Sequence, residues 1–171
     1  MSPDDRVAAW AGLLRVHAAV VPRLERELAG VGMPLSWYDV LLELNAAPDR
    51  RLRMTELGAR VVLSRERVSR VVDELERAGL VHRERNPDDG RSLLAVVTDE
   101  GRARLRAAAP TYLAGIARHF GAHLDDDEAR TLAAALHRVV EAEDPAASPS
   151  RRTALSSERP GRRTSRTPPT R

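Results

Sequence analysis

The sequence predicts a mainly α-helical fold that carries one small β-hairpin near its centre. Apolar residues recur three or four positions apart through most of residues 3–143, which is the spacing of amphipathic helices. Residues 81–98 differ, because two short β-like runs flank a polar stretch rich in Pro, Asp and Gly, which is typical of a turn. Two helical patterns joined by a tight turn stand directly before them, at residues 55–77. A helix-turn-helix followed at once by a hairpin is a winged helix.

The second helix of this pair, about residues 64–77, has an apolar stripe and a polar side. The stripe follows helical spacing and is predicted to be buried; it consists of Val68, Val71, Val72 and Leu75. The polar side chains mostly outside the stripe are the predicted DNA contacts of this helix: Ser64, Arg65, Arg67, Ser69 and Arg70.

Charge is distributed along this helix in an unusual direction. Arginines occupy its N-terminal half, and Asp73, Glu74 and Glu76 occupy its C-terminal half. The helix macrodipole favours the opposite arrangement, so the basic half has an electrostatic cost in isolation. An anionic partner would offset this cost, and a recognition helix presents that end to the DNA major groove. A solvated charged face is the competing interpretation of the helix taken alone.

The predicted hairpin consists of strands at Val81–Arg85 and Leu93–Thr98, joined by Asn86–Ser92. Arg91 lies near its tip, where a side chain can reach the minor groove of DNA. A further short strand at Leu52–Met54 is expected to pair beside the hairpin.

The central segment resembles the MarR family of multiple antibiotic resistance regulators, and the likeness extends over about residues 5–143. The residues that carry it are Trp37-Tyr38-Asp39-Val40-Leu41, Leu63-Ser64-Arg65, Leu75-Glu76-Arg77-Ala78-Gly79-Leu80-Val81, Asp89-Gly90-Arg91-Ser92 and Val97-Thr98-Asp99-Glu100-Gly101. The resemblance implies that Asp89 pairs with arginines and braces the wing around Arg91.

The resemblance also implies a two-fold homodimer that binds double-stranded DNA at a palindromic operator, and we expect a repressor released by a small aromatic effector. In the family the terminal helices of two subunits interlock, and a pocket between them and the winged helix often takes aromatic acids. The residues that fall on the matching helices are Trp10, His17, Trp37 and Tyr112. Their competing interpretation is that they are ordinary core residues with satisfied polar tips.

Caps and breakers divide the remaining chain into helices. Predicted N-caps are Ser2, Ser36, Thr55, Thr98 and Asp125, and Gly30 and Gly79 are predicted to end helices. Interior prolines at positions 22 and 110 are expected to kink their helices.

These patterns predict a winged-helix domain over residues 1–144, with DNA binding by 35–98 and dimerisation by helices at 3–30 and 99–143. Residues 145–171 hold seven arginines and one glutamate among Pro, Ser and Thr, and we expect a disordered basic tail that is either a DNA-binding arm or inert. The chain has no cysteine, no basic signal-peptide start and no uninterrupted apolar run of about 20 residues. We therefore expect a cytoplasmic protein that needs no membrane.

Three alternatives compete with a ligand-responsive DNA-binding regulator. His119 and His123 are four residues apart and would share a helical face, so a zinc-responsive regulator of the same fold is possible on spacing alone. An enzyme is not expected, because the sequence contains no G-x-S-x-G, phosphate-binding glycine loop or H-E-x-x-H motif, and no cofactor is expected either. A winged helix used for protein interaction would require apolar residues on the exposed face of helix 64–77.

Overall fold

The computed structural model describes residues 3–61 and 63–143 of the chain. Its elements are α1 (Pro3–Gly30), α2 (Leu35–Ala46), η1 (Pro48–Arg50), β1 (Arg51–Arg53), α3 (Met54–Arg60), α4 (Arg65–Arg77), β2 (Val81–Arg85), β3 (Leu93–Val97), α5 (Asp99–His119), η2 (Gly121–His123) and α6 (Asp126–Glu143). The prediction of a mainly helical winged helix is confirmed. The predicted cap Ser2 and the tail at 145–171 lie outside the described residues.

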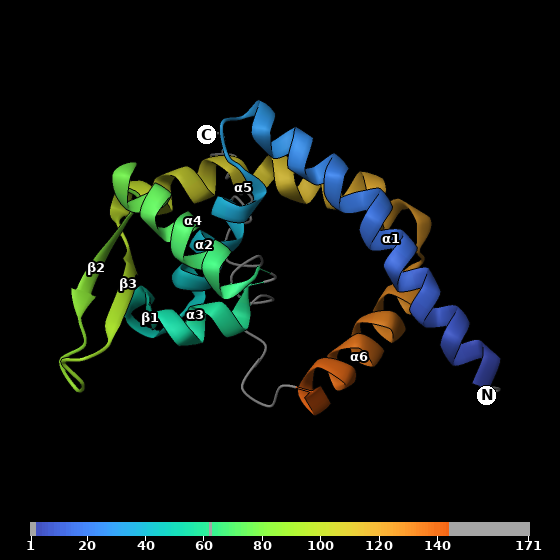
Figure 1. Ribbon diagram of the computed structural model, residues 1–171. Coiled ribbons are helices and arrows are strands. Elements are labelled where there is room, and N and C mark those ends of the chain that lie inside the picture. Colours follow the sequence, from blue (N-terminus) through green and yellow to red (C-terminus); the bar gives the residue numbers. More distant parts are fainter. Residues whose placement is uncertain (1–2, 62, 144–171) are drawn as a thin grey trace, which may run out of the picture.

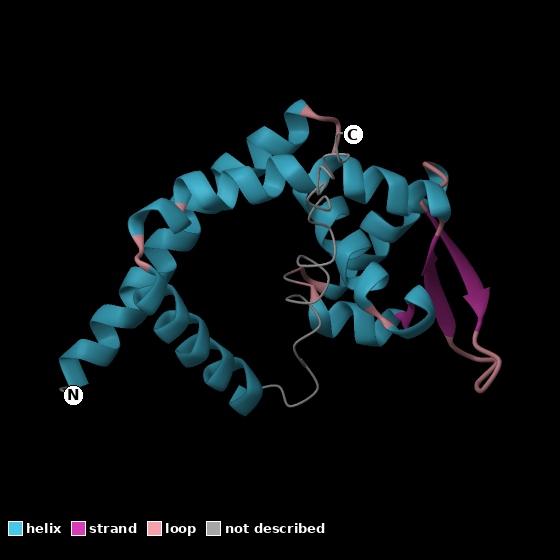
Figure 2. Ribbon diagram, turned by 180° about the vertical axis from the view of Figure 1, so that it is seen from behind, coloured by secondary structure: helices cyan, strands magenta, loops and turns pink. Residues whose placement is uncertain are grey.

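The molecule has a globular end and an extended end (Figure 1). The helices α2, α3 and α4 gather at the globular end beside the β-sheet, and α5 leads from that body along α1. The N-terminal half of α1 leads away from the winged helix, whereas α6 turns back from the far end of α5 without joining the core, as the view from behind also shows (Figure 2). The recognition elements therefore lie at the globular end, while the N-terminal half of α1 and the whole of α6 lie outside it.

One hydrophobic core fills the globular end and reaches the near halves of α1 and α5. The apolar stripe of α4 is buried as predicted, with each of its four side chains at most 4% exposed. Leu28 of α1 and Leu105 of α5 join the same core. Packing of α4 on this core is what fixes its polar side outward.

The sheet has the strand order β1-β3-β2, and all pairs are antiparallel. Val81 pairs with Val97 and Arg85 pairs with Leu93, so the hairpin closes in the register that the turn residues predict. The strand beside the hairpin is also confirmed, although it covers Arg51–Arg53 and begins one residue earlier than expected.

Three predicted helix ends, at Thr98, Asp125 and Gly79, are confirmed by their hydrogen bonds, and α4 has a cap at Ser64 that the sequence analysis did not assign. Ser64 Oγ accepts from the backbone N–H of Arg67, and Thr98 Oγ1 accepts from that of Gly101. Asp125 and Glu128 cap α6 reciprocally, since the carboxylate of each residue accepts the backbone N–H of the other. Gly79 adopts a φ of 72°, and Leu80 N–H returns to the carbonyl of Leu75, which is a Schellman ending.

Three other predicted ends were wrong by one or two residues. The helix α2 begins at Leu35, because the carbonyl of Pro34 already accepts the N–H groups of Trp37 and Tyr38; Ser36 lies inside the helix. The helix α3 begins at Met54 rather than after Thr55, and the Glu56 carboxylate accepts the N–H of Arg53 there. The helix α1 continues through Gly30, and the left-handed residue is Gly32, with a φ of 71°.

Both interior prolines are accommodated without interrupting their helices, since α1 runs continuously through Pro22 and α5 through Pro110. By length and composition alone, Asp4–Gly30 is the one helix among the described residues that could cross a membrane. This is weak evidence, because helices of soluble proteins pass the same test.

Candidate nucleic-acid interface

The exposed side of α4 is polar along its N-terminal two turns. Arg67, Ser69 and Arg70 are all exposed, and Glu66 is the acid among them. Their positions alternate with the buried valines, so packing of the valines holds the arginines at the surface. Arginines on a rigid helix face can make bidentate contacts with guanine edges or bind phosphate.

The start of α4 is fixed by its cap. Ser64 is exposed, and its hydroxyl accepts the backbone N–H of Arg67 at 3.4 Å. The side chain that is predicted to contact DNA therefore also caps the helix. Arg65 is the first residue of the helix; its side chain lies outside what the structure describes.

The tip of the hairpin is held by hydrogen bonds within the turn itself. Asn86, which is 4% exposed, donates from Nδ2 to Ser92 Oγ at 3.1 Å and accepts the N–H of Asp88 at Oδ1. The backbone of Asn86 also pairs with Ser92 at 3.0 Å. The prediction of site residues missed Asn86, although an Asn directly before Pro-Asp at a strand end is a recognisable turn signal.

Asp89 and Arg91 lie exposed at this tip, as predicted. The Asp89 carboxylate accepts the backbone N–H of Arg91 at 3.2 Å, and its carbonyl accepts from Ser92. Asp89 forms no ion pair with an arginine side chain among the described residues. Its contact therefore braces the turn through the backbone, which leaves the Arg91 guanidinium available to a partner.

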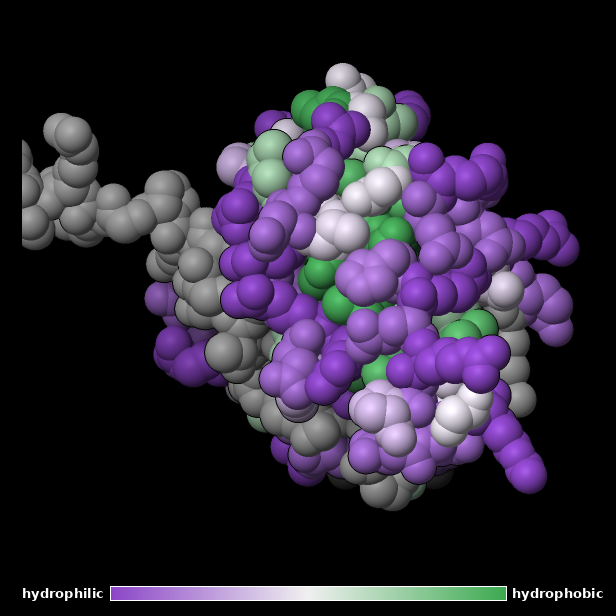
Figure 3. Space-filling view, turned by 90° about the vertical axis from the view of Figure 1, so that its left-hand side faces the viewer, coloured by the Kyte–Doolittle hydropathy of each residue, from purple (hydrophilic) through white to green (hydrophobic). Residues whose placement is uncertain are grey.

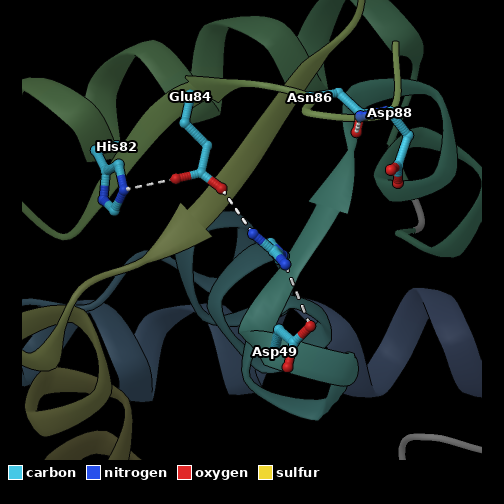
Figure 4. A network of polar contacts seen from close by, with 6 residues as sticks. Asp49, His82, Glu84, Asn86 and Asp88 are labelled. Atoms are coloured by element: carbon cyan, nitrogen blue, oxygen red, sulfur yellow. Dashed lines mark hydrogen bonds and ion pairs between the residues drawn. The ribbon is translucent and has the colours of Figure 1, made fainter.

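A polar network crosses the sheet on the side of β1 (Figure 4). Arg51 on β1 donates to Glu84 Oε1 on β2 at 3.1 Å and to Asp49 Oδ2 at 3.3 Å, and His82 lies 3.7 Å from the other Glu84 oxygen. The bond with the Glu84 carboxylate raises the pKa of the Arg51 guanidinium above its ordinary value. The network ties the two outer strands together across β3.

The acids at the C-terminal half of α4 hold neighbouring elements. Glu74 accepts the indole N–H of Trp37 on α2 at 2.8 Å. The guanidinium of Arg83 on β2 forms ion pairs with the carboxylates of Asp73, at 2.6 Å, and Glu76, at 2.5 Å. The sequence indicated none of these contacts, because their partners lie up to 37 residues away.

The surface at the hairpin end is dominated by hydrophilic side chains, with only small hydrophobic areas between them (Figure 3). The exposed residues of α4 agree with this, since none is a large apolar residue. A polar, arginine-bearing surface is suited to nucleic acid and unsuited to an apolar protein interface.

Comparisons with known proteins agree with this geometry. A family model described as MarR family matches residues 31–92. The transcriptional repressor YetL of Bacillus subtilis is 30% identical over 105 residues, which are 61% of this chain and 63% of YetL; the chain thus spans under two thirds of that relative. Sco3205, a MarR family transcriptional regulator of Streptomyces coelicolor solved in complex with DNA, is 31% identical with a TM-score of 0.73, covering 83% of this chain and 89% of Sco3205. The chain belongs to the MarR family.

A second similar solved structure holds a ligand. CouR of Rhodococcus jostii RHA1, bound to p-coumaroyl-CoA, is 27% identical with a TM-score of 0.66, and the match covers 74% of this chain and 87% of CouR. YetL and Sco3205 are named as regulators of transcription.

The predicted effector residues of this MarR family chain separate into two places. Trp37 and Tyr112 are half-buried at the α2–α5 side of the core, and the ring of Tyr112 lies 4.5 Å from that of Tyr38. Trp10 is 61% exposed, and His17 is exposed on the same projecting half of α1. A single chain therefore does not bring the four together.

The shared helical face predicted for His119 and His123 was wrong. The helix α5 ends at His119, and His123 belongs to η2. His119 Nε2 instead lies 2.8 Å from Glu27 Oε1 on α1, which also accepts from Arg118 at 2.7 Å. The bond with His119 is the main cause of a lowered pKa at the Glu27 carboxyl. No group of three or more potential metal ligands occurs in the part of the chain that the structure covers.

The projecting helices expose apolar side chains that this chain does not cover. The large ones are Val7, Trp10, Leu13, Leu14 and Val16 on α1, and Val139 and Val140 on α6. No residue of α6 is buried. Several large apolar side chains left exposed on these helices favour an interaction site there.

Proposed function

We propose that this chain is a homodimeric transcriptional repressor that binds a palindromic DNA operator and is released by a small aromatic effector. The observation that carries the proposal is the polar face of α4, with Arg67 and Arg70 exposed next to a hairpin that exposes Arg91. Two such elements on one rigid body match the two grooves of a DNA duplex.

Dimerisation follows from the uncovered apolar side chains of α1 and α6. Burying a large apolar side chain contributes about 1.5–3 kcal/mol, so seven such residues left in water make the isolated chain unfavourable. A second copy supplies a matching surface, because a two-fold interface is self-complementary. Two-fold symmetry then places two recognition helices roughly 34 Å apart, one turn of DNA.

Two observations support release by an effector. Trp37 and Tyr112 are half-buried aromatic residues at the α2–α5 side of the core, and Trp37 is hydrogen-bonded to α4. The relative CouR carries an aromatic acyl ligand. In a dimer, the partner's α1 can also reach this region and bring Trp10 and His17 toward it. An effector that favours one dimer geometry shifts the population away from the DNA-bound one.

The decisive experiment is selection of genomic DNA fragments on the purified full-length protein, followed by sequencing. We expect enrichment of imperfect inverted repeats, with half-site centres about one helical turn apart. The protein should sediment as a dimer at the same concentration. Enrichment of no common motif, with affinity equal for all fragments, would overturn sequence-specific regulation.

The effector arm uses the selected operator. Simple aromatic carboxylates should raise the melting temperature of the protein and weaken its operator binding, since a ligand that binds one state stabilises that state. A zinc salt provides the contrasting treatment. Release of DNA by zinc, with no response to any aromatic acid, would favour the metal-responsive alternative.

A further inference from the structure

The reversed charge pattern of α4 has a structural explanation. Acids near a helix C-terminus are unfavourable with the macrodipole. Here each of them holds a neighbouring element: Glu74 accepts from Trp37 of α2, while Asp73 and Glu76 receive Arg83 from β2. The acidic half of α4 is therefore an anchoring surface, and the basic half is left for a partner.

Arg83 makes the most extensive of these contacts. Its Nη2 lies 2.6 Å from Asp73 Oδ1, and its Nη1 lies 2.5 Å from Glu76 Oε2. Its backbone N–H donates to the second oxygen of Glu76 at 2.9 Å, and Nη2 also reaches the Ser69 carbonyl at 3.4 Å. The Arg83 side chain is only 18% exposed, so these charge-assisted bonds are partly shielded from water.

The position of Arg83 connects the two predicted DNA-contacting elements. It stands in the middle of β2, three residues before Asn86, where the hairpin turn begins. On α4 it spans Ser69 to Glu76, which is two turns of the helix and includes part of the predicted reading face. The planar fork of arginine can bind both carboxylates at once, which a lysine ammonium cannot reproduce with the same geometry.

We propose that Arg83 is a positioning residue that locks the wing to the recognition helix, so that Arg91 and the arginines of α4 engage DNA as one unit. This proposal rests on the proposed function. It assigns Arg83 no DNA contact of its own, because its guanidinium is already occupied by two carboxylates. Without the ion pairs of Arg83, β2 can still pair with β3, but the angle between this hairpin and α4 is no longer fixed.

A double-mutant cycle tests this coupling. The variants are Arg83→Met, Arg91→Ala and the double variant, with Arg85→Met as the matched control. Arg85 is exposed on the same strand, and it forms no ion pair with any residue that the structure describes. Arg85→Met therefore removes the same charge without removing a bond to α4. Operator affinity is measured by fluorescence anisotropy at constant salt.

Arg91→Ala should weaken operator binding on the order of tenfold in the native and Arg85→Met backgrounds. In the Arg83→Met background it should cost less than about twofold, because an unheld wing has little contact left to lose. Additive effects of Arg83→Met and Arg91→Ala would overturn the proposal, since additivity is what independent contacts produce.

Hydrogen exchange provides a readout that needs no DNA. Arg83→Met should accelerate amide exchange in residues 86–92 and leave the protection of α5 unchanged; Arg85→Met should alter neither. Unchanged exchange in the hairpin would overturn the lock even if DNA binding fell. If the native protein selected no operator, the proposed function would fail, while this measurement would still decide the lock.

Glu76→Ala covers the case in which Arg83→Met does not fold. It removes an acid from the DNA-facing half of the molecule, so electrostatics alone predicts tighter binding. Loss of the lock predicts weaker binding, by severalfold or more. Tighter operator binding by Glu76→Ala would therefore overturn the proposal.

Discussion

The indole nitrogen of Trp37 donates to Glu74 Oε2 at 2.8 Å, and this bond joins α2 to the recognition helix. Trp37 is half-buried against the core, and Glu74 is half-exposed near the end of α4. Since Trp37 is also a predicted effector residue, the bond would transmit displacement of its ring directly to α4.

Trp37→Phe should lower the free energy of unfolding by about 1 kcal/mol or more, because it keeps a six-membered aromatic ring but removes the five-membered ring with its N–H donor to a partly buried carboxylate. Urea unfolding measures the change. Glu74→Gln in the same background should then add little, since the bond is already lost. Equal stability of Trp37→Phe and the parent, or full additivity of the two changes, would contradict the coupling.

Arg70→Ala should reduce operator affinity by about 1–3 kcal/mol and relax preference at one base pair, as expected for a base-reading arginine. Arg65→Ala is predicted to behave in the same way. The measurement is competition binding with operators changed at single positions. An equal loss for every sequence would make the residue a phosphate contact instead.

The wing makes a prediction in which the sign is decisive. Arg91→Ala should lower operator affinity and change folding stability by less than ~0.5 kcal/mol, because the side chain is exposed in a loop. Asp89→Ala should also weaken binding, although it removes a negative charge, because the N–H of Arg91 loses its acceptor. Tighter binding by Asp89→Ala, measured against Asp88→Ala as a neighbouring charge control, would leave Asp89 as only a repulsive charge.

Stability should depend on pH through Glu27. Its folded pKa is lowered, mainly by the bond with His119 and also by Arg118, so its contribution is complete above the ordinary carboxyl pKa. That contribution is lost as the pH falls through the lowered folded value. Glu27→Gln should therefore be less stable than the parent at neutral pH, with the difference shrinking below pH ~4.

Urea midpoints across this pH range measure the effect, and Glu25→Gln, an exposed neighbour on α1, is the control. A difference between Glu27→Gln and the parent that stays constant with pH would show that packing over Gly115, rather than the ion pair, is what Glu27 provides. Glu27 does pack there, because a Cβ at Gly115 would lie 2.7 Å from its Oε2.

The sequence by itself determined the elements whose signals are local. The apolar stripe of α4, the Thr98 and Asp125 caps, the Gly79 ending and the turn after β2 each depend on residues within one or two turns of one another. Such patterns act before any tertiary contact forms, so they are readable from the chain. These local patterns located the winged helix along the chain. They also predicted which arginines are exposed, apart from Arg65, whose side chain is not described.

Only the tertiary structure decided which charges are already paired. Arg83 and Arg85 look alike in sequence, yet one is held between two carboxylates and the other is exposed. His119 looked like a partner for His123, yet it meets Glu27, which is 92 residues away. Periodicity gives the face of a helix on which a side chain lies. The partner it meets depends on how separate elements pack against one another, which the spacing of residues within one helix does not contain.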